Sequence, residues 1–133
     1  MTQEKELLAL AISASKLAYA PYSKFAVGCV VVSVSGKIYT GCNVENVSFG
    51  LTNCAERTAV FKGVSVEGDH FKINKVIIFT PTDVPVSPCG ACRQVLKEFG
   101  DGFEVVSYCN GDASISMSID ELIPASPDIR FKG

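Results

Sequence analysis

The spacing of hydrophobic residues predicts a helix at the start of the chain. Between Thr2 and Tyr19, apolar and small residues recur at three- and four-residue intervals, as on one face of an amphipathic helix. Thr2 is a candidate N-cap, and Pro21 is expected to end the helix. Two strand-like segments follow, over 25–34 and 37–43, with Ser35-Gly36 between them, and they predict a β-hairpin.

The rest of the chain alternates between helical and strand-like patterns. A helix is expected over 51–62, with Gly63 ending it, and a second helix is expected from Pro88 to 99. Strands are expected over 73–80 and 103–108, and an edge strand over 115–119 is followed by a short helical turn to Ile123.

This order of elements predicts an α/β fold. A strand between two helices needs crossover connections, so we expect a three-layer α-β-α arrangement with helices on both faces of a mixed five-stranded sheet. The chain has 133 residues and no linker-like break, so residues 1–133 are expected to form one domain.

Composition and charge exclude several classes of protein. With 47% apolar and 20% charged residues, the chain is not of the disordered type, and its apolar excess indicates a buried subunit interface. The net charge is −2 and no basic cluster is present, which argues against a nucleic-acid partner. The acidic N-terminus and the lack of a long apolar run predict a cytoplasmic protein with no membrane partner.

The cysteines are the first residues that indicate a metal-binding or catalytic site. Six are present, and a reducing cytoplasm favours metal binding or catalysis over a disulfide framework. Cys89 and Cys92 are three residues apart at the start of one predicted helix, so both sulfurs can reach one ion. Cys54 lies at the start of the preceding helix, and a helix N-terminus favours the thiolate.

Three thiolates predict a catalytic zinc, because the fourth tetrahedral position must hold water. A fourth protein ligand would instead make a structural site in a module without enzymatic activity. The candidates for it have no pairing spacing and lie in apolar strands, so we interpret them as core cysteines. They are Cys29, Cys42 and Cys109.

Glu56 follows Cys54 by two residues and is the candidate proton carrier. Alone it would be interpreted as part of a capping box with Asn53. Beside a zinc-bound water, a carboxylate can move the protons that hydrolysis requires. A thioredoxin-like redox pair is the alternative for Cys-x-x-Cys, but it leaves Glu56 unexplained. The only histidine, His70, lies in a polar loop and is expected to be solvated.

Cys-x-Glu followed by Pro-Cys-x-x-Cys is the signature of zinc deaminases. With it, the chain resembles the small homotetrameric cytidine deaminases, and the resemblance runs from about 19 to 99. The matching segments are Pro21-Tyr22-Ser23, Phe25-Ala26-Val27-Gly28, Asn43-Val44-Glu45-Asn46, Cys54-Ala55-Glu56-Arg57-Thr58-Ala59 and Pro88-Cys89-Gly90-Ala91-Cys92-Arg93-Gln94.

The resemblance implies hydrolysis of cytidine and 2′-deoxycytidine to uridine and 2′-deoxyuridine, as in pyrimidine salvage. One Zn²⁺ per chain would be held by Cys54, Cys89 and Cys92. Zinc-bound hydroxide would attack C4 of the base, with Glu56 as the proton shuttle.

The resemblance also implies the substrate contacts. Phe25 would stack on the pyrimidine, Asn43 and Glu45 would hold the ribose 3′-hydroxyl, and the backbone near Ala55 and Cys89 would orient the base. The segment 47–49, including Phe49, would come from a neighbouring subunit of a homotetramer.

Two further residues would act behind the metal ligands. Arg57 would hydrogen-bond the sulfurs and offset the negative charge of three thiolates on zinc, and Gln94 would support Arg57.

Three departures from the family leave the substrate open. Phe49 stands where the family has tyrosine, and Cys29 where it has alanine. The family closes its site with a phenylalanine after Leu-Leu-Pro, where this chain has Ser126 and Pro127, with Phe131 later. A modified cytosine nucleoside or blasticidin S is therefore the alternative substrate. A polynucleotide-editing deaminase would need a basic groove, against which the charge argues.

Overall fold

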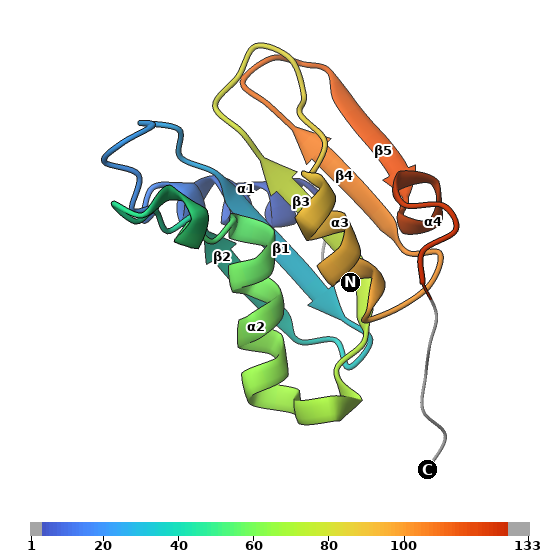
Figure 1. Ribbon diagram of the computed structural model, residues 1–133. Coiled ribbons are helices and arrows are strands. Elements are labelled where there is room, and N and C mark those ends of the chain that lie inside the picture. The colour runs from blue at the N-terminus through green and yellow to red at the C-terminus, as the bar shows by residue number, and fades with distance from the viewer. Residues whose placement is uncertain (1–3, 128–133) are drawn as a thin grey trace.

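The computed structural model describes residues 4–127 and shows five strands with helices around them (Figure 1). The candidate cap Thr2 and the late Phe131 lie outside the described residues. Helix α1 covers Glu4–Ser15 and ends before the predicted Tyr19. Tyr19 instead forms an isolated β-bridge with Val44, because its backbone makes hydrogen bonds to the residues that directly follow the hairpin.

The strands form the predicted mixed five-stranded sheet. They are β1 (Gly28–Ser33), β2 (Ile38–Cys42), β3 (Ile73–Phe79), β4 (Glu104–Tyr108) and β5 (Ser114–Ser118). Their order is β2-β1-β3-β4-β5, with β3 and β4 parallel and the other neighbours antiparallel. The position of β5 at the edge confirms the prediction for that segment.

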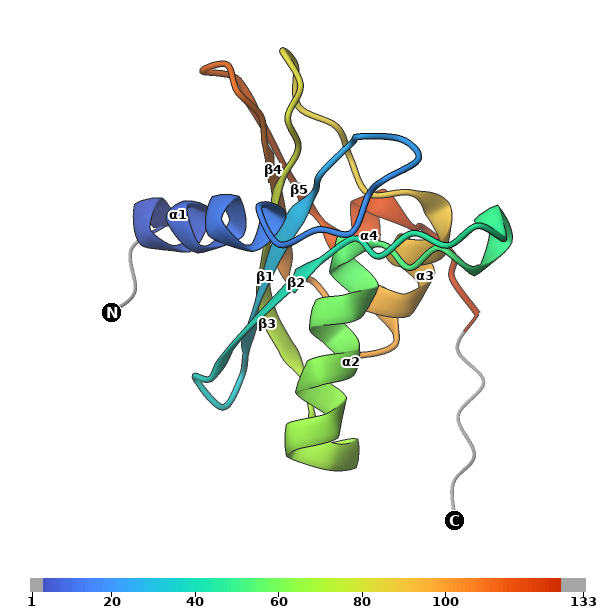
Figure 2. The same cartoon turned by 90° about the vertical axis from the view of Figure 1, so that its left-hand side faces the viewer.

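Helices cover both faces of the sheet, which confirms the three-layer arrangement. Helix α1 packs on one face, while α2 (Ala55–Glu67), α3 (Gly90–Lys97) and the short α4 (Ile119–Leu122) lie on the other (Figure 2). Two 3₁₀ turns, Phe49–Leu51 and Gly68–His70, flank α2. None of the helices within residues 4–127 is long and apolar enough to cross a membrane.

The predicted bounds of the helix over 51–62 were wrong at both ends. Helix α2 begins at Ala55 and continues through Gly63 to Glu67. Gly63 is needed for packing, because a Cβ there would lie 2.4 Å from the ring of Phe71. A glycine inside a helix is tolerated when a neighbour approaches this closely.

Two other glycines, one in β1 and one in β2, let helices come close to the sheet. A Cβ on Gly28 would lie 1.8 Å from the carbonyl oxygen of Ala11 in α1. A Cβ on Gly41 would lie 2.5 Å from the carbonyl oxygen of Ala55. The start of α2, where Cys54 lies, is thereby held against the β1–β2 hairpin.

The core has one part on each face of the sheet. Leu7 and Ala11 pack with Val30 and Ile77 beneath α1. On the other face, α2, α3 and α4 cover a larger cluster that includes Val31, Val60, Ile78, Leu96 and Ile119. The site lies on this second face, where α2 and α3 begin.

Candidate metal centre and active site

Three cysteine sulfurs converge where α2 and α3 begin. Cys54 is the N-cap of α2, Cys89 is the N-cap of α3, and Cys92 lies in the first turn of α3. The three Sγ atoms all lie within 4.8 Å of one another. In the part of the chain described, no histidine, carboxylate or further cysteine joins this group.

The spacing of the sulfurs fits a tetrahedral zinc. The Sγ atoms of Cys54 and Cys89 are 3.9 Å apart. Two thiolates bound at about 2.3 Å to a tetrahedral ion lie about 3.8 Å apart, whereas a disulfide would bring them to about 2.05 Å. These residues therefore fit a zinc ion.

The other cysteines are not close enough to complete the group. Cys29 in β1 is fully buried, and Cys109 after β4 is buried with its thiol donating toward the carbonyl groups of Asp83 and Ala113. Cys42, at the end of β2, is only half-buried, so the interpretation as a core cysteine was wrong for that residue.

The surroundings of Cys54, Arg57 among them, favour its thiolate form. The Nη2 of Arg57 donates to the Sγ of Cys54 at 3.1 Å. The pKa of Cys54 is lowered to about 5, chiefly by its hydrogen bond with Cys92 and then by Arg57. The same hydrogen bond and burial raise the pKa of Cys92, because Cys92 then acts as the donor. A cation placed among the sulfurs would favour thiolate at both.

Glu56 is a buried carboxyl group beside the cluster. Only 5% of the residue is exposed, and burial raises the pKa of its carboxyl group above the usual range. It does not form the capping box considered as an alternative, because the N-cap is Cys54 and no side chain caps the helix. Asn53 instead donates to the hydroxyl of Thr58 at 3.1 Å. A buried carboxyl group with a raised pKa suits proton transfer near neutral pH.

A cavity of about 230 Å³ opens onto these groups. Its lining includes Cys54, Glu56 and Cys89, and also Ala55 and Phe25. An adjoining hollow of about 260 Å³ shares Thr52 with it and is lined by other residues: Tyr22, Ser23, Glu45 and Phe49. The pair of hollows has room for a flat base beside the thiols and a polar group beyond it.

Asn43 and Glu45 hold the segment that carries Phe25. The side chain of Asn43 donates to the carbonyl of Phe25 at 2.7 Å and accepts from the amide of Val27 at 2.9 Å. It also lines the first cavity. Sequence reasoning gave Asn43 only a sugar contact and missed this anchoring role, because periodicity carries no signal for a bond across 18 residues.

Glu45 makes the corresponding contacts nearer the second hollow. Its carboxylate accepts from the backbone amides of Tyr22 and Ser23, at 3.0 and 3.1 Å, and from the Ser23 hydroxyl. The Ser23 hydroxyl is the main cause that lowers the pKa of Glu45. The carboxylate therefore stays ionised and fixes the wall of the hollow.

Two predicted site residues lie away from the sulfurs. Phe49 is 73% exposed and meets the ring of Tyr22 edge-on, with ring centres 5.7 Å apart. Gln94 is exposed and its amide donates to the hydroxyl of Ser126 at 3.2 Å. The expected support of Arg57 by Gln94 is not what the structure shows, since Gln94 faces the C-terminal segment. His70 is exposed, as expected.

The chain matches known proteins along most of its length. Residues 1–109 match the family model for the cytidine and deoxycytidylate deaminase zinc-binding region. The chain is 45% identical over 123 residues to a cytidine deaminase of Sporosarcina psychrophila, covering 92% of this chain and 89% of that one. It is 43% identical over 126 residues to a probable cytidine deaminase of Dictyostelium discoideum, covering 93% and 84%.

The fold comparison agrees. The crystal structure of cytidine deaminase from Burkholderia pseudomallei superposes with a TM-score of 0.86 at 40% identity, covering 94% of this chain and 99% of that one.

Proposed function

The chain belongs to the cytidine and deoxycytidylate deaminase family, and on this premise we propose that it hydrolyses cytidine and 2′-deoxycytidine to uridine and 2′-deoxyuridine. The observation that supports this most directly is that the buried Glu56 lines one cavity together with two cysteines of the three-sulfur cluster, Cys54 and Cys89. Residues 1–133 would act as one deaminase domain in the cytoplasm, where reduced cysteines persist.

Cys54, Cys89 and Cys92 would hold one zinc ion per chain. When bound, zinc lowers the pKa of water to about 7 and so supplies a nucleophile near neutral pH. Arg57 would offset the negative charge of the three thiolates through its bond to Cys54.

Glu56 would carry the protons of the reaction. Its carboxylate takes a proton from the attacking water and passes it to N3 of the cytosine ring as the C4–O bond forms. It then takes the remaining proton from the new hydroxyl on C4 and transfers it to the amino group on the same carbon. The C4–N bond breaks to release ammonia as the C4 carbonyl of the product forms. Burial raises the pKa of this carboxyl group above its usual range, which supports both roles because it makes the protonated form easier to reach.

The walls of the cavity would position the nucleoside. Phe25 would stack on the base and the backbone at Ala55 and Cys89 would orient its polar edge, since all three line the cavity. Asn43, which lines the first cavity, and Glu45, which lines the second hollow, would hold the 3′-hydroxyl. Both residues also hydrogen-bond the chain near Phe25. These bonds support the assignment, because they fix the side-chain oxygens that would accept a hydrogen bond from the 3′-hydroxyl.

A homotetramer with shared sites would cover the exposed apolar residues beside the cavity. Val47 and Leu51 are exposed together with Phe49 on the segment that the resemblance assigns to a neighbour's site. Exposed apolar residues gathered on one short segment support an interaction surface there. We expect analytical ultracentrifugation to give about four times the chain mass of 14.2 kDa. A protein that stays monomeric while active would contradict shared sites.

The direct test is an ultraviolet absorbance assay of nucleoside loss, on purified protein assayed for zinc. We expect conversion of cytidine and 2′-deoxycytidine with about one zinc per chain, and none of cytosine in single-stranded DNA. Activity on the DNA alone would show a polynucleotide deaminase. Conversion only of a modified cytosine nucleoside or of blasticidin S would favour the alternative that Ser126 and Pro127 suggest, because they replace the family's closing phenylalanine.

A further inference from the structure

We propose that Arg93 is a positioning residue that holds the Cys89 end of the metal centre and connects it to the C-terminal segment. The proposal rests on the proposed function in one respect, since it takes the three-cysteine cluster to be the working metal site. In the described contacts Arg93 bonds neither Arg57 nor a sulfur. Its two side-chain bonds both go to backbone carbonyl groups, one of which belongs to Pro88 in the cavity lining.

The first bond fixes the peptide that enters the metal centre. The Nε of Arg93 donates to the carbonyl oxygen of Pro88 at 2.7 Å. Pro88 is buried and directly precedes Cys89. The described peptide bonds include no cis form, and in a trans peptide the carbonyl and the next amide point in opposite directions. Holding the Pro88 carbonyl therefore sets the orientation of the Cys89 amide and of the chain that presents its sulfur.

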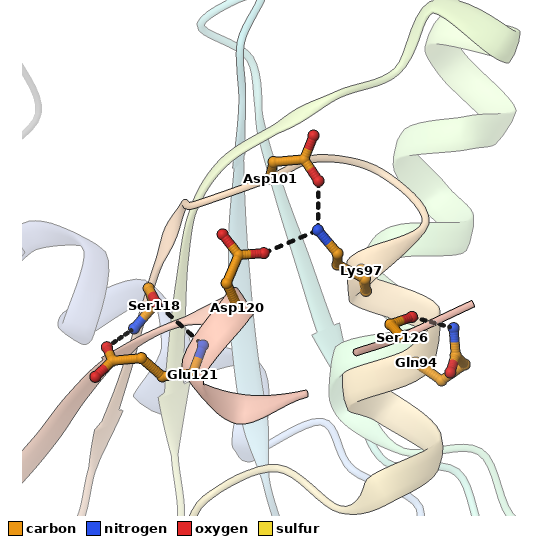
Figure 3. Close-up of polar contacts among 7 residues, drawn as sticks. All are labelled: Gln94, Lys97, Asp101, Ser118, Asp120, Glu121 and Ser126. Atoms are coloured by element: carbon orange, nitrogen blue, oxygen red, sulfur yellow. Dashed lines mark hydrogen bonds and ion pairs between the residues drawn. The ribbon is translucent and has the colours of Figure 1, made fainter. Parts of the chain in front are cut away.

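The second bond joins this peptide to the end of α4. The Nη1 of Arg93 donates to the carbonyl oxygen of Leu122 at 3.0 Å. Leu122 is buried, and α4 is fixed at its start by a capping box between Ser118 and Glu121 (Figure 3). Arg93 therefore links the Pro88 carbonyl to a carbonyl of a buried residue at the end of a capped helix.

Arginine is needed for this brace because of its shape. A planar guanidinium presents several N–H groups in a fixed fork, so one side chain can donate to two carbonyl groups along set directions. Lysine offers one flexible ammonium and would hold at most one of the two in a fixed geometry. We therefore expect R93K to lose the positioning although it keeps the positive charge. A purely electrostatic role would leave R93K unaffected.

Lys97, one turn further along α3, provides a matched control. It also joins α3 to α4, through an ion pair with Asp120 at 2.8 Å, and it pairs with Asp101 in the loop after α3 (Figure 3). Its side-chain contacts within residues 4–127 go to these two carboxylates, away from Pro88 and Cys89, and it is no part of the proposed catalytic machinery. Removing the Lys97 side chain should loosen the contact between α3 and α4, while Arg93 still bonds the Pro88 carbonyl.

The experiment compares R93K, R93Q and K97Q with the unmodified zinc-loaded protein. Zinc release to a chromogenic chelator is measured for each, together with the thiolate and ligand-field absorption of the Co²⁺-substituted forms. We expect R93K and R93Q to release zinc about 10- to 100-fold faster and to alter the cobalt spectrum. For cytidine, kcat should fall by a similar factor with KM changed less. K97Q should stay within about twofold in every measurement.

Several outcomes would overturn the proposal. The proposal is wrong if both Arg93 variants release zinc at the normal rate and have an unchanged cobalt spectrum. It is also wrong if K97Q has equal effects, because these would show only a loosened C-terminal region. Misfolding of R93Q leaves R93K to decide, and misfolding of both would show a structural role alone. If the unmodified protein binds zinc but does not deaminate cytidine, the proposed function fails while the metal measurements still decide on Arg93. If it binds no zinc, both fail.

Discussion

Glu56→Gln is expected to lower kcat for cytidine by about 10⁴-fold while zinc stays bound at one ion per chain. Glutamine has nearly the same shape but cannot take a proton from water or return one to the substrate. Because Glu56 is proposed to act in both transfers, the loss should reach the upper end of what one acid–base residue contributes. The variant should fold normally, since removing a buried ionisable carboxyl group also removes its desolvation cost.

Glu67→Gln is a matched control for this substitution. Glu67 lies at the other end of α2, where its carboxylate accepts from Ser33, Ser35 and Tyr39. Its replacement should affect stability and leave kcat nearly unchanged. Zinc content is measured by atomic absorption and kcat by the ultraviolet assay. If Glu56→Gln kept more than about a tenth of the activity with full zinc, Glu56 would not be the proton carrier.

The convergence of the three cysteines could be predicted because its signals are local. Pro88 and the i, i+3 spacing of Cys89 and Cys92 place two sulfurs on one helical turn. The order of elements then places the start of α2 beside the start of α3. The fold class followed from the same order, since a strand between helices restricts the topology.

What could not be predicted depends on contacts between distant residues. Gly63 carries the usual signal for a helix end, yet α2 continues because the ring of Phe71 occupies the space of a side chain there. Gln94 adjoins the metal motif, but its partner Ser126 lies 32 residues away. Asn43 was assigned to the substrate alone, and its bonds to Phe25 and Val27 cross the hairpin. Periodicity and motif spacing contain no information on such pairs.

Cys89→Ala is expected to remove zinc from the protein and with it all measurable deamination. Two thiols remain, and a site that loses one of three protein ligands loses most of its affinity. Cys89 is the best of the three for this test because it is exposed, whereas Cys92 is fully buried and its replacement would also leave a cavity in the core. A loss of activity in Cys89→Ala can therefore be assigned to the metal, provided that circular dichroism shows an unchanged fold.

Cys42→Ala is the matched control, since it also removes a free thiol that is not fully buried. It should keep one zinc per chain and full activity. The pair also separates the deaminase from the redox alternative for Cys89 and Cys92. A redox protein would purify with little metal, and its two cysteines would form a disulfide on mild oxidation that Cys89→Ala abolishes. The deaminase should purify with zinc, and its cluster should resist oxidation until a chelator removes the ion, because metal-bound thiolates are not free to react.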